Sequence, residues 1–230
     1  MDIIFVNPPL TLKERFGKFA PAGNIMPPLG LCYLAAACRA HGLKAEIIDA
    51  PAEGLDTAKV KERILQRRPR FLGLTATTLS ILNASRVAQA VKHEANDILT
   101  VIGGPHLSSA PQRTMERHPF FDFGVIGEGE STIIELIDSV QGNLDIEGVN
   151  GIIYHSPGGL RRTEIRENIK DLDALPLPAF DIRKVGPDLV LQFYHRRGQQ
   201  GDLGINEGSR LLEDRLRDRK RQPGNTKTDE

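Results

Sequence analysis

The chain has 230 residues, 40% of them hydrophobic, and 30 lysine and arginine side chains balance 30 aspartate and glutamate side chains. The length allows one large domain or a medium domain with an appendage. The even charge excludes a basic surface for nucleic acid and an acidic disordered chain.

Five short apolar runs predict β-strands, because each is rich in branched or aromatic residues and is followed by turn-forming residues. They lie at residues 3–7, 45–49, 71–75, 99–103 and 123–126. Amphipathic stretches between and after them predict helices at residues 29–41, 57–67, 80–93, 111–117 and 131–140. Gly42 is expected to end the first helix, and Ser80 and Ser131 are expected to cap the starts of two others. Residues 10–27 contain glycine and proline and are expected to form a long loop.

This alternation predicts an α/β fold, a Rossmann-like doubly wound domain whose parallel five-stranded sheet carries helices on both faces. The predicted domain covers residues 1–142, and residues 143–190 add a β-hairpin, with its turn at 156–159, and a proline-rich linker. Residues 191–230 are crowded with charges and poor in apolar side chains. A disordered tail is therefore expected there.

Four of the predicted strands are followed by segments where a ligand site is expected, and three of these four segments are small, hydroxyl-rich or glycine-rich. In open parallel sheets, ligands bind beyond the carboxyl ends of the strands, near a topological switch point. Small residues there let a bulky ligand approach the backbone, and hydroxyl and N–H groups offer hydrogen bonds. Each group alone has an ordinary explanation as turn or cap residues, but all share one predicted edge. The candidate binding residues are Pro8, Pro9, Thr75, Thr77, Thr78, Ser80, Gly103, Gly104, Pro105, His106, Gly127, Glu128, Gly129 and Glu130.

Several common sites are disfavoured. The first strand and helix are not joined by G-x-G-x-x-G, and the chain has no G-x-x-x-x-G-K-[ST], which argues against a conventional NAD enzyme or P-loop ATPase. Cys32 and Cys38 are the two cysteines, too few to ligate zinc or an iron–sulfur cluster. His106 as a metal ligand is a weaker interpretation than a surface or hydrogen-bonding residue. No metal site built from protein side chains is predicted.

Four motifs occur in order along the chain and carry a family resemblance. They are Pro27-Pro28-Leu29-Gly30-Leu31, Gly103-Gly104-Pro105-His106, the stretch from Phe121-Asp122-Phe123 to Gly127-Glu128-Gly129-Glu130, and LPLPAFD at 175–181. Together they resemble the N-terminal cobalamin-binding domain of cobalamin-dependent radical SAM enzymes, over about residues 1–185.

The resemblance implies cobalamin at the carboxyl edge of the sheet. Residues 75–80 and Gly103-Gly104 would flank the nucleotide tail, the 127–130 loop would line the same pocket, and the loop after the first strand would face the lower side of the corrin. The cobalamin domains of methionine synthase and the mutases carry D-x-H-x-x-G after the first strand, whose histidine ligates cobalt. Here that loop reads NPPLTL, from Asn7 to Leu12. We therefore expect base-off cobalamin with no protein histidine on cobalt, which favours reduced cobalt(I) and methyl transfer.

The catalytic half of the resembled family is not expected in this chain. In that family a C-x-x-x-C-x-x-C motif holds a [4Fe–4S] cluster that binds SAM, but here no cysteine follows Cys38. We expect no cluster, no SAM site and no radical SAM activity from this chain alone. One hypothesis is a reading frame truncated or shifted before the barrel; a stand-alone cobalamin carrier is the other. A separate radical SAM subunit is the expected protein partner.

Two other function classes stay open. A nucleotide- or flavin-binding Rossmann-like enzyme is disfavoured by the missing phosphate motif. A receiver-like regulatory module would need an acidic pocket after the first strand and an aspartate ending the third, where the chain has Asn7 and Thr75. No apolar run is long enough to span a bilayer, and the N-terminus lacks a basic region and a cleavage site. Neither a membrane nor a nucleic acid is an expected partner, and a cytoplasmic protein is expected.

Overall fold

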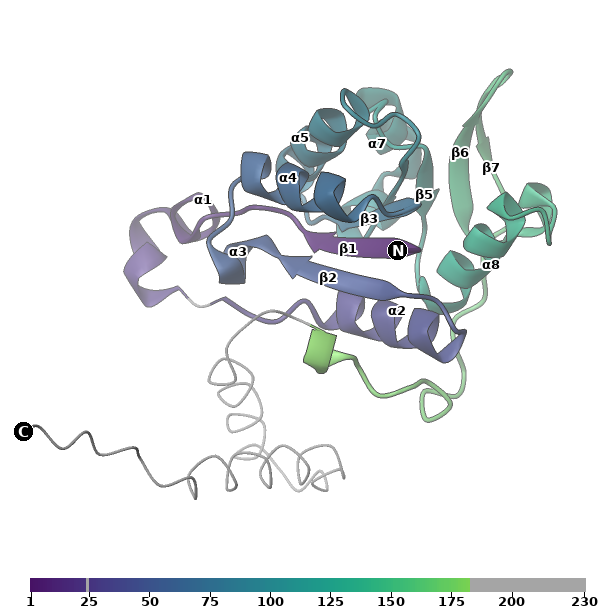
Figure 1. Cartoon of the computed structure of the whole chain (residues 1–230), viewed down its shortest axis with the longest axis horizontal. Helices are drawn as coiled ribbons and strands as arrows, with labels where there is room; N and C mark the ends of the chain where they lie inside the picture. Colours follow the sequence, from purple (N-terminus) through teal and green to yellow (C-terminus); the bar gives the residue numbers. More distant parts are fainter. Residues whose placement is uncertain (24, 183–230) are drawn as a thin grey trace, which may run out of the picture. The chain divides into compact units, whose positions relative to one another are not determined.

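Seven strands form one sheet in the computed structural model, which describes residues 1–23 and 25–182 (Figure 1). The strands follow the spatial order β2-β1-β3-β4-β5-β6-β7. The first five are parallel, and β6 and β7 extend the sheet antiparallel. The predicted tail at 191–230 lies outside the described residues. The strands are β1 (Ile3–Asn7), β2 (Ala45–Asp49), β3 (Phe71–Thr75), β4 (Leu99–Gly103), β5 (Phe123–Val125), β6 (Ile152–Ser156) and β7 (Gly159–Arg162).

Eight helices connect or follow the strands, and in the described part of the chain none is long and apolar enough to cross a membrane. Short 3-10 segments lie at Gly17–Ala22, Ile146–Gly148 and Phe180–Ile182. The helices are α1 (Leu12–Phe16), α2 (Leu29–Ala40), α3 (Ala50–Glu53), α4 (Thr57–Arg67), α5 (Ile81–Lys92), α6 (Pro105–Ser109), α7 (Pro111–Arg117) and α8 (Glu130–Val140).

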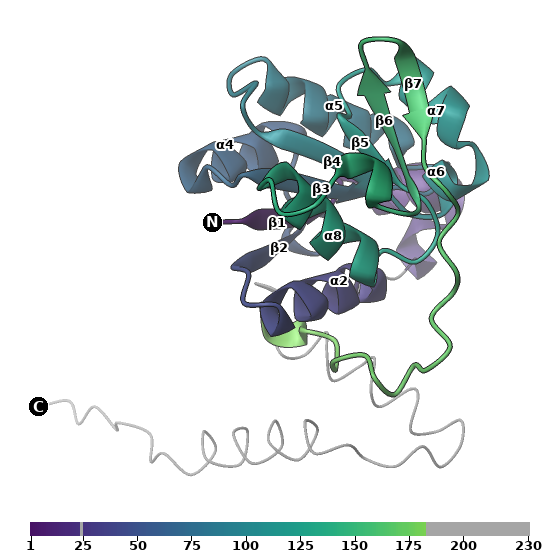
Figure 2. The ribbon, with the colours of Figure 1, turned by 90° about the vertical axis from the view of Figure 1, so that its right-hand side faces the viewer.

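The sheet has a hydrophobic core on each face. Along β1, Ile4 and Val6 point into the core formed with α4 and α5, while Ile3 and Phe5 point into the core formed with α2 and α8. This alternation follows from the two-residue period of a strand. Figures 1 and 2 show α4 and α5 on one side of the sheet and α2 on the other. The predicted doubly wound α/β fold is confirmed.

The hairpin has a place in the sheet that its sequence does not indicate. It pairs through β6 with β5, with Val125 opposite Ile152, so the five parallel strands continue into a mixed seven-stranded sheet. Its turn falls at Pro157-Gly158, between the two strands. Ile152 and Ile153 are fully buried, which shows that the hairpin contributes to the domain core.

Residues 10–27 contain regular structure, contrary to the prediction of a loop. Thr11 caps α1: its Oγ1 accepts a hydrogen bond from the Glu14 N–H at 3.1 Å, and Glu14 Oε2 accepts from the Thr11 N–H at 2.7 Å. The hydrogen bond from the Thr11 N–H, followed by one from the Thr11 hydroxyl to the same carboxylate oxygen at 2.8 Å, lowers the pKa of Glu14. The reciprocal pair is a capping box, which fixes where this short helix begins.

Several predicted boundaries shift by one residue, including the end of α2 at Ala40 and both ends of α5, which covers Ile81–Lys92. Strand β5 ends at Val125 rather than at residue 126, and α8 begins at Glu130, with Gly129 rather than Ser131 at the cap position. Ser80 does precede α5, but its Oγ accepts from the Thr77 N–H at 3.0 Å instead of capping the helix.

Cys32 and Cys38 are both fully buried in α2. Burial, followed by the charge of Asp2, raises the pKa of the Cys38 thiol to about 12. Because the thiolate is the reactive form, a thiol reagent at pH 8 is expected to label the folded protein at least about 100-fold more slowly than the unfolded chain. Timed labelling with and without denaturant measures this ratio, and equal rates would contradict it.

The same thiol makes stability depend on pH. The folded pKa lies above the unfolded one, so deprotonation favours the unfolded chain. The stability that Cys38 contributes is therefore complete below the ordinary thiol pKa of 9.0 and is lost as the pH rises towards the folded pKa of about 12. Cys38→Ser is expected to flatten this alkaline loss, measured as the free energy of unfolding against pH.

Candidate functional site

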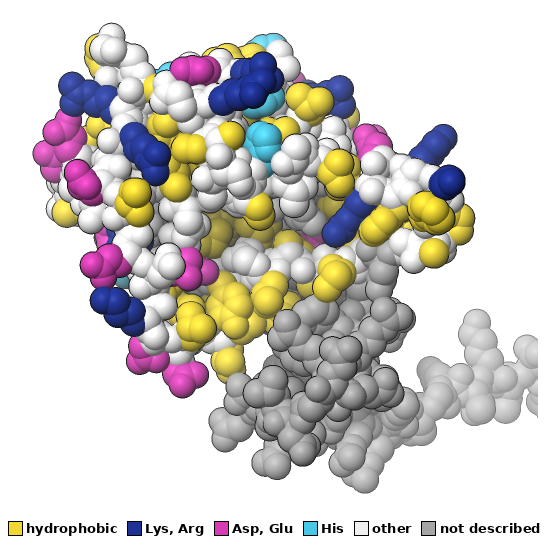
Figure 3. Space-filling view, turned by 180° about the vertical axis from the view of Figure 1, so that it is seen from behind, with side chains coloured by type: hydrophobic (Ala, Val, Ile, Leu, Met, Phe, Trp, Pro, Cys, Tyr) yellow, Lys and Arg dark blue, Asp and Glu magenta, His cyan; other side chains and the backbone are white. Residues whose placement is uncertain are grey.

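A cavity of about 840 Å³ opens at the carboxyl ends of the parallel strands. Asn7 ends β1, Thr75 ends β3 and Gly103 ends β4, and all three line the cavity. The chain leaves β1 towards β2 on one side and returns to β3 on the other, so the cavity lies at the topological switch point. On the face seen in Figure 3, hydrophobic side chains gather around a hollow, and basic and acidic side chains are scattered rather than grouped by sign.

The structure brings most of the predicted site residues together in the cavity wall. They come from the segments after β3, β4 and β5, as parallel strands require. Pro8, Pro9 and His106 are not part of the lining: the Pro9 carbonyl accepts from Asn83 Nδ2 at 2.6 Å, and His106 Nδ1 lies 3.2 Å from Thr78 Oγ1. The predicted residues in the wall are Thr75, Thr77, Thr78, Ser80, Gly103, Gly104, Pro105, Gly127, Glu128, Gly129 and Glu130.

Gly104 brings the turns after β3 and β4 into contact. Its φ of +95° is a conformation that side chains rarely adopt, and a Cβ there would lie 2.7 Å from Thr75 Oγ1. The close approach is held by backbone hydrogen bonds from the Ala76 N–H to the Gly103 carbonyl at 3.0 Å and from the His106 N–H to the Ala76 carbonyl at 3.1 Å. Pro105 then begins α6, a position that needs no backbone N–H.

Two other glycines keep the cavity wide. A Cβ on Gly30 would meet nothing within 4 Å, and a Cβ on Gly103 would meet only the Val125 carbonyl oxygen, at 3.8 Å. Both residues line the cavity, so a side chain at either position would occupy space that is now open. At these two positions a ligand can therefore approach the backbone closely.

The opposite wall comes from residues 10–34, none of which is among the candidate binding residues, although the resemblance implied that the loop from Asn7 to Leu12 would face the corrin. Apart from Arg15, this wall is apolar. Two signals were available for this wall: residues 27–31 form one of the four motifs, and Leu10 and Leu12 lie in the loop that the resemblance expected to face the corrin. No such signal singled out Arg15. The residues of this wall are Leu10, Leu12, Arg15, Ile25, Met26, Pro27, Pro28, Leu29, Gly30, Leu31 and Leu34.

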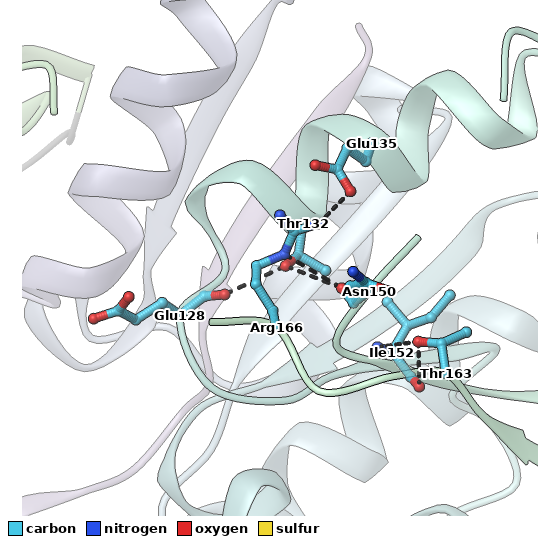
Figure 4. A network of polar contacts seen from close by, with 7 residues as sticks. All are labelled: Glu128, Thr132, Glu135, Asn150, Ile152, Thr163 and Arg166. Carbon is cyan, nitrogen blue, oxygen red and sulfur yellow. Dashed lines mark hydrogen bonds and ion pairs between the residues drawn. The ribbon is translucent and has the colours of Figure 1, made fainter. Parts of the chain in front are cut away.

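The acidic loop before α8 joins the cavity to the chain that follows the hairpin. Glu128 Oε2 accepts from the Ile169 N–H at 2.5 Å, and Oε2 of its neighbour Glu130 is buried and has no hydrogen-bond partner among the described residues. Thr132 Oγ1 donates to the Glu128 carbonyl at 3.4 Å (Figure 4). Both acids also line the cavity, so the same loop borders the cavity and holds the segment after the hairpin.

Arg166, which precedes Ile169, anchors the same segment (Figure 4). Its guanidinium forms an ion pair with Glu135 of α8, and its Nε donates to the Asn150 carbonyl at 3.4 Å. Asp181 pairs with Arg39 at 2.9 Å, and the Ala179 N–H donates to the Cys32 carbonyl at 3.0 Å. Residues 163–182 are thus attached to α8 and α2.

Comparison with known families supplies the deciding observation. The B12 binding domain family matches residues 19–137, which include most of the cavity wall. The chain belongs to the B12-binding domain family. The predicted resemblance to the cobalamin-binding domain of radical SAM enzymes is confirmed.

Curated relatives of this B12-binding domain are longer proteins. An uncharacterized methyltransferase, PH0819, from Pyrococcus horikoshii is 35% identical over 183 residues, which are 79% of this chain and 39% of that protein. The anaerobic magnesium-protoporphyrin IX monomethyl ester cyclase of Rubrivivax gelatinosus is 34% identical over 180 residues, covering 76% of this chain and 32% of the cyclase. The chain spans about a third of the length of these relatives.

Solved structures share the fold. The cobalamin-dependent S-adenosylmethionine radical enzyme OxsB, with aqua-cobalamin and S-adenosylmethionine bound, superposes with a TM-score of 0.65 at 24% identity, over 79% of this chain and 24% of OxsB. The methyltransferase TsrM from Kitasatospora setae, with cobalamin and a [4Fe-4S] cluster bound, gives a TM-score of 0.59 at 20% identity, over 76% of this chain and 31% of TsrM.

Proposed function

We propose that the cavity at the carboxyl ends of β1, β3, β4 and β5 holds cobalamin. The observation that carries this is the coincidence of the family match with a large cavity at the switch point, walled by apolar side chains and by glycines that leave room at the backbone. A volume of about 840 Å³ is at the upper end for small-molecule sites. The residues present therefore fit a wide, mostly apolar ring with polar arms.

Within this proposal, each wall has a role. The hydroxyls of Thr75, Thr77 and Thr78 offer hydrogen bonds to the nucleotide tail, and Gly103 gives it access to the backbone. The loop after β1 faces the lower side of the corrin. Bound cobalamin supplies a cobalt centre that can accept and release a methyl group.

We further propose base-off cobalamin without a protein histidine on cobalt. The residue that ends β1 at the cavity is Asn7, whose amide is not a strong cobalt ligand. His106 is the histidine among the predicted site residues, but it is not part of the cavity lining, and its Nδ1 lies 3.2 Å from the Thr78 hydroxyl.

The reaction itself would need a radical SAM partner. Both cysteines of the chain are buried in α2, away from the cavity lining, so we propose that neither ligates a cluster. The relatives are a methyltransferase and a cyclase, and the part of them that this chain spans matches the cobalamin domain. We infer that the chain presents cobalamin to a radical SAM protein of that methyltransferase or cyclase class.

Retention of a corrin tests the proposal. The purified protein is mixed with hydroxocobalamin, desalted and examined by visible spectroscopy; we expect retained corrin absorbance of the base-off type, unchanged in His106→Ala. FMN and NAD carried through the same steps test the flavin and nucleotide alternatives. A protein that retains no corrin, or that retains FMN in its place, would overturn the proposal.

A further inference from the structure

Asn7 and Asp49 form a polar pair at the edge of the cavity. They are register partners at the carboxyl ends of β1 and β2, and Asn7 Nδ2 donates to Asp49 Oδ1 at 2.8 Å. Asp49 is fully buried and is not part of the cavity lining, whereas Asn7 lines the cavity. The pair therefore connects a buried carboxylate to the surface that a ligand would contact.

The carboxylate fixes which way the Asn7 amide points. Because Asn7 Nδ2 donates to Asp49 Oδ1, the NH₂ group of Asn7 is the end that faces Asp49. Asn7 Oδ1 is then the end left over, and no described residue donates a hydrogen bond to it. The pair thus leaves one acceptor unused at the cavity.

Asp49 is itself held in place through α3. Its backbone N–H donates to Glu53 Oε1 at 3.3 Å, and Glu53 Oε2 pairs with Arg63 Nη1 at 2.6 Å. The Glu53 side chain is only 9% exposed. The bond to α3 fixes the Asp49 backbone, and full burial leaves its carboxylate no solvent-exposed position to turn to, which favours the Asn7 orientation seen here.

We propose that Asn7 Oδ1 accepts a hydrogen bond from an N–H or O–H donor of the bound corrinoid, and that Asp49 is the positioning residue that fixes this orientation. The inference rests on the proposed cobalamin function and adds a named contact to it. Corrinoids carry such donors as the primary amides around the ring and as an axial water on cobalt. Both are neutral donors that suit an amide oxygen.

Two double variants separate the cavity contact from the support of the fold. Asn7→Leu with Asp49→Leu removes both polar partners together, which leaves neither of them orphaned. Asn7→Asp with Asp49→Asn (N7D/D49N) exchanges the two side chains. The amide now at position 49 is expected to donate to the carboxylate now at position 7, which still presents an oxygen to the cavity. Thermal melting of both proteins checks that each is folded.

The measurement is the dissociation constant for hydroxocobalamin, followed by absorbance. We expect about tenfold weaker binding for N7L/D49L and binding within about twofold of the original protein for N7D/D49N. Equal affinities of the two folded variants would overturn the inference while leaving the proposed function intact. If the original protein retains no corrin, the proposed function fails, and this inference falls with it.

Two corrinoids without the nucleotide tail distinguish the donors. Aquacobinamide and dicyanocobinamide both keep ring amides, but the second carries cyanide at both axial positions and no water. If N7L/D49L loses affinity equally for aquacobinamide and dicyanocobinamide, the donor is a ring amide. If the variant loses affinity for aquacobinamide alone, the donor is the axial water. If it loses affinity for neither corrinoid, the inference is overturned.

Discussion

Replacing Gly103 by leucine is expected to abolish corrin retention while the protein stays folded. Gly103 ends β4 and lines the cavity, and a Cβ there would meet only the Val125 carbonyl oxygen, at 3.8 Å. The backbone therefore tolerates a side chain, and the three further carbons of leucine fill space that the ring would need. We expect affinity for hydroxocobalamin to fall at least about 100-fold, because the rigid corrin ring and the leucine side chain would occupy the same space.

Two other glycines provide controls. Gly148→Leu places the same side chain in the 3-10 segment at Ile146–Gly148, outside the cavity lining, where a Cβ would meet nothing within 4 Å, so corrin binding is expected to be unchanged. Gly104→Ala is expected to lower the melting temperature, because its φ is +95° and its Cβ would lie 2.7 Å from Thr75 Oγ1. A folded Gly103→Leu protein that binds corrin as tightly as Gly148→Leu would show that the cavity is not the cobalamin site.

The strands were predictable because their apolar runs are short and separated by helices of clear amphipathic period. Bounds of β1 to β4 match the prediction. The place of the hairpin was not predictable, since the pairing of Val125 with Ile152 joins segments that are far apart in the chain. Helix α1 was missed even though Thr11 and Glu14 have capping-box spacing, because five residues flanked by glycine and proline show no hydrophobic period.

One half of the site was also predictable, for a topological reason. Parallel strands end at the same edge, so Thr75, Gly103 and Gly127 had to lie near one another. The apolar wall from Leu10 to Leu34 depends on how a long connection folds back over that edge. The contact of Asn7 with Asp49 depends on the register between β1 and β2, which neither strand reveals alone.

Asp122 belongs to one of the four family motifs. We expect it to stabilise the fold rather than to bind the cofactor. It precedes β5, and its Oδ2 accepts from the Thr100 N–H at 2.7 Å and from Lys92 Nζ at 2.6 Å. Its own N–H donates to Thr100 Oγ1 at 3.0 Å. Thr100 is fully buried and the Lys92 side chain is 9% exposed, so one carboxylate joins β4, the start of β5 and the end of α5.

Asp122→Ala is therefore expected to lower the free energy of unfolding by about 3 kcal/mol, because it leaves a buried N–H without its acceptor and a nearly buried ammonium without its counter-charge. For a domain of this size, that corresponds to a fall in melting temperature of about 6–12 °C. Among the described residues, the hydrogen-bond acceptor that Lys92 would keep is the Asn96 carbonyl, at 3.2 Å. Asp122→Asn retains an acceptor oxygen for Thr100, so it is expected to lower the free energy of unfolding by about half as much as Asp122→Ala.

The control for the ion pair is Asp97→Ala. Asp97 pairs with Arg68, but both side chains are more than 60% exposed, so its loss is expected to cost at most about 0.5 kcal/mol. Asp122 is not part of the cavity lining, and at a temperature where Asp122→Ala is folded its affinity for hydroxocobalamin is expected to match that of the original protein. Equal melting temperatures for Asp122→Ala and Asp97→Ala would contradict the structural role. Weakened corrin binding by a fully folded Asp122→Ala would instead show that this motif residue reaches the cofactor, which its hydrogen bonds to β4 and α5 argue against.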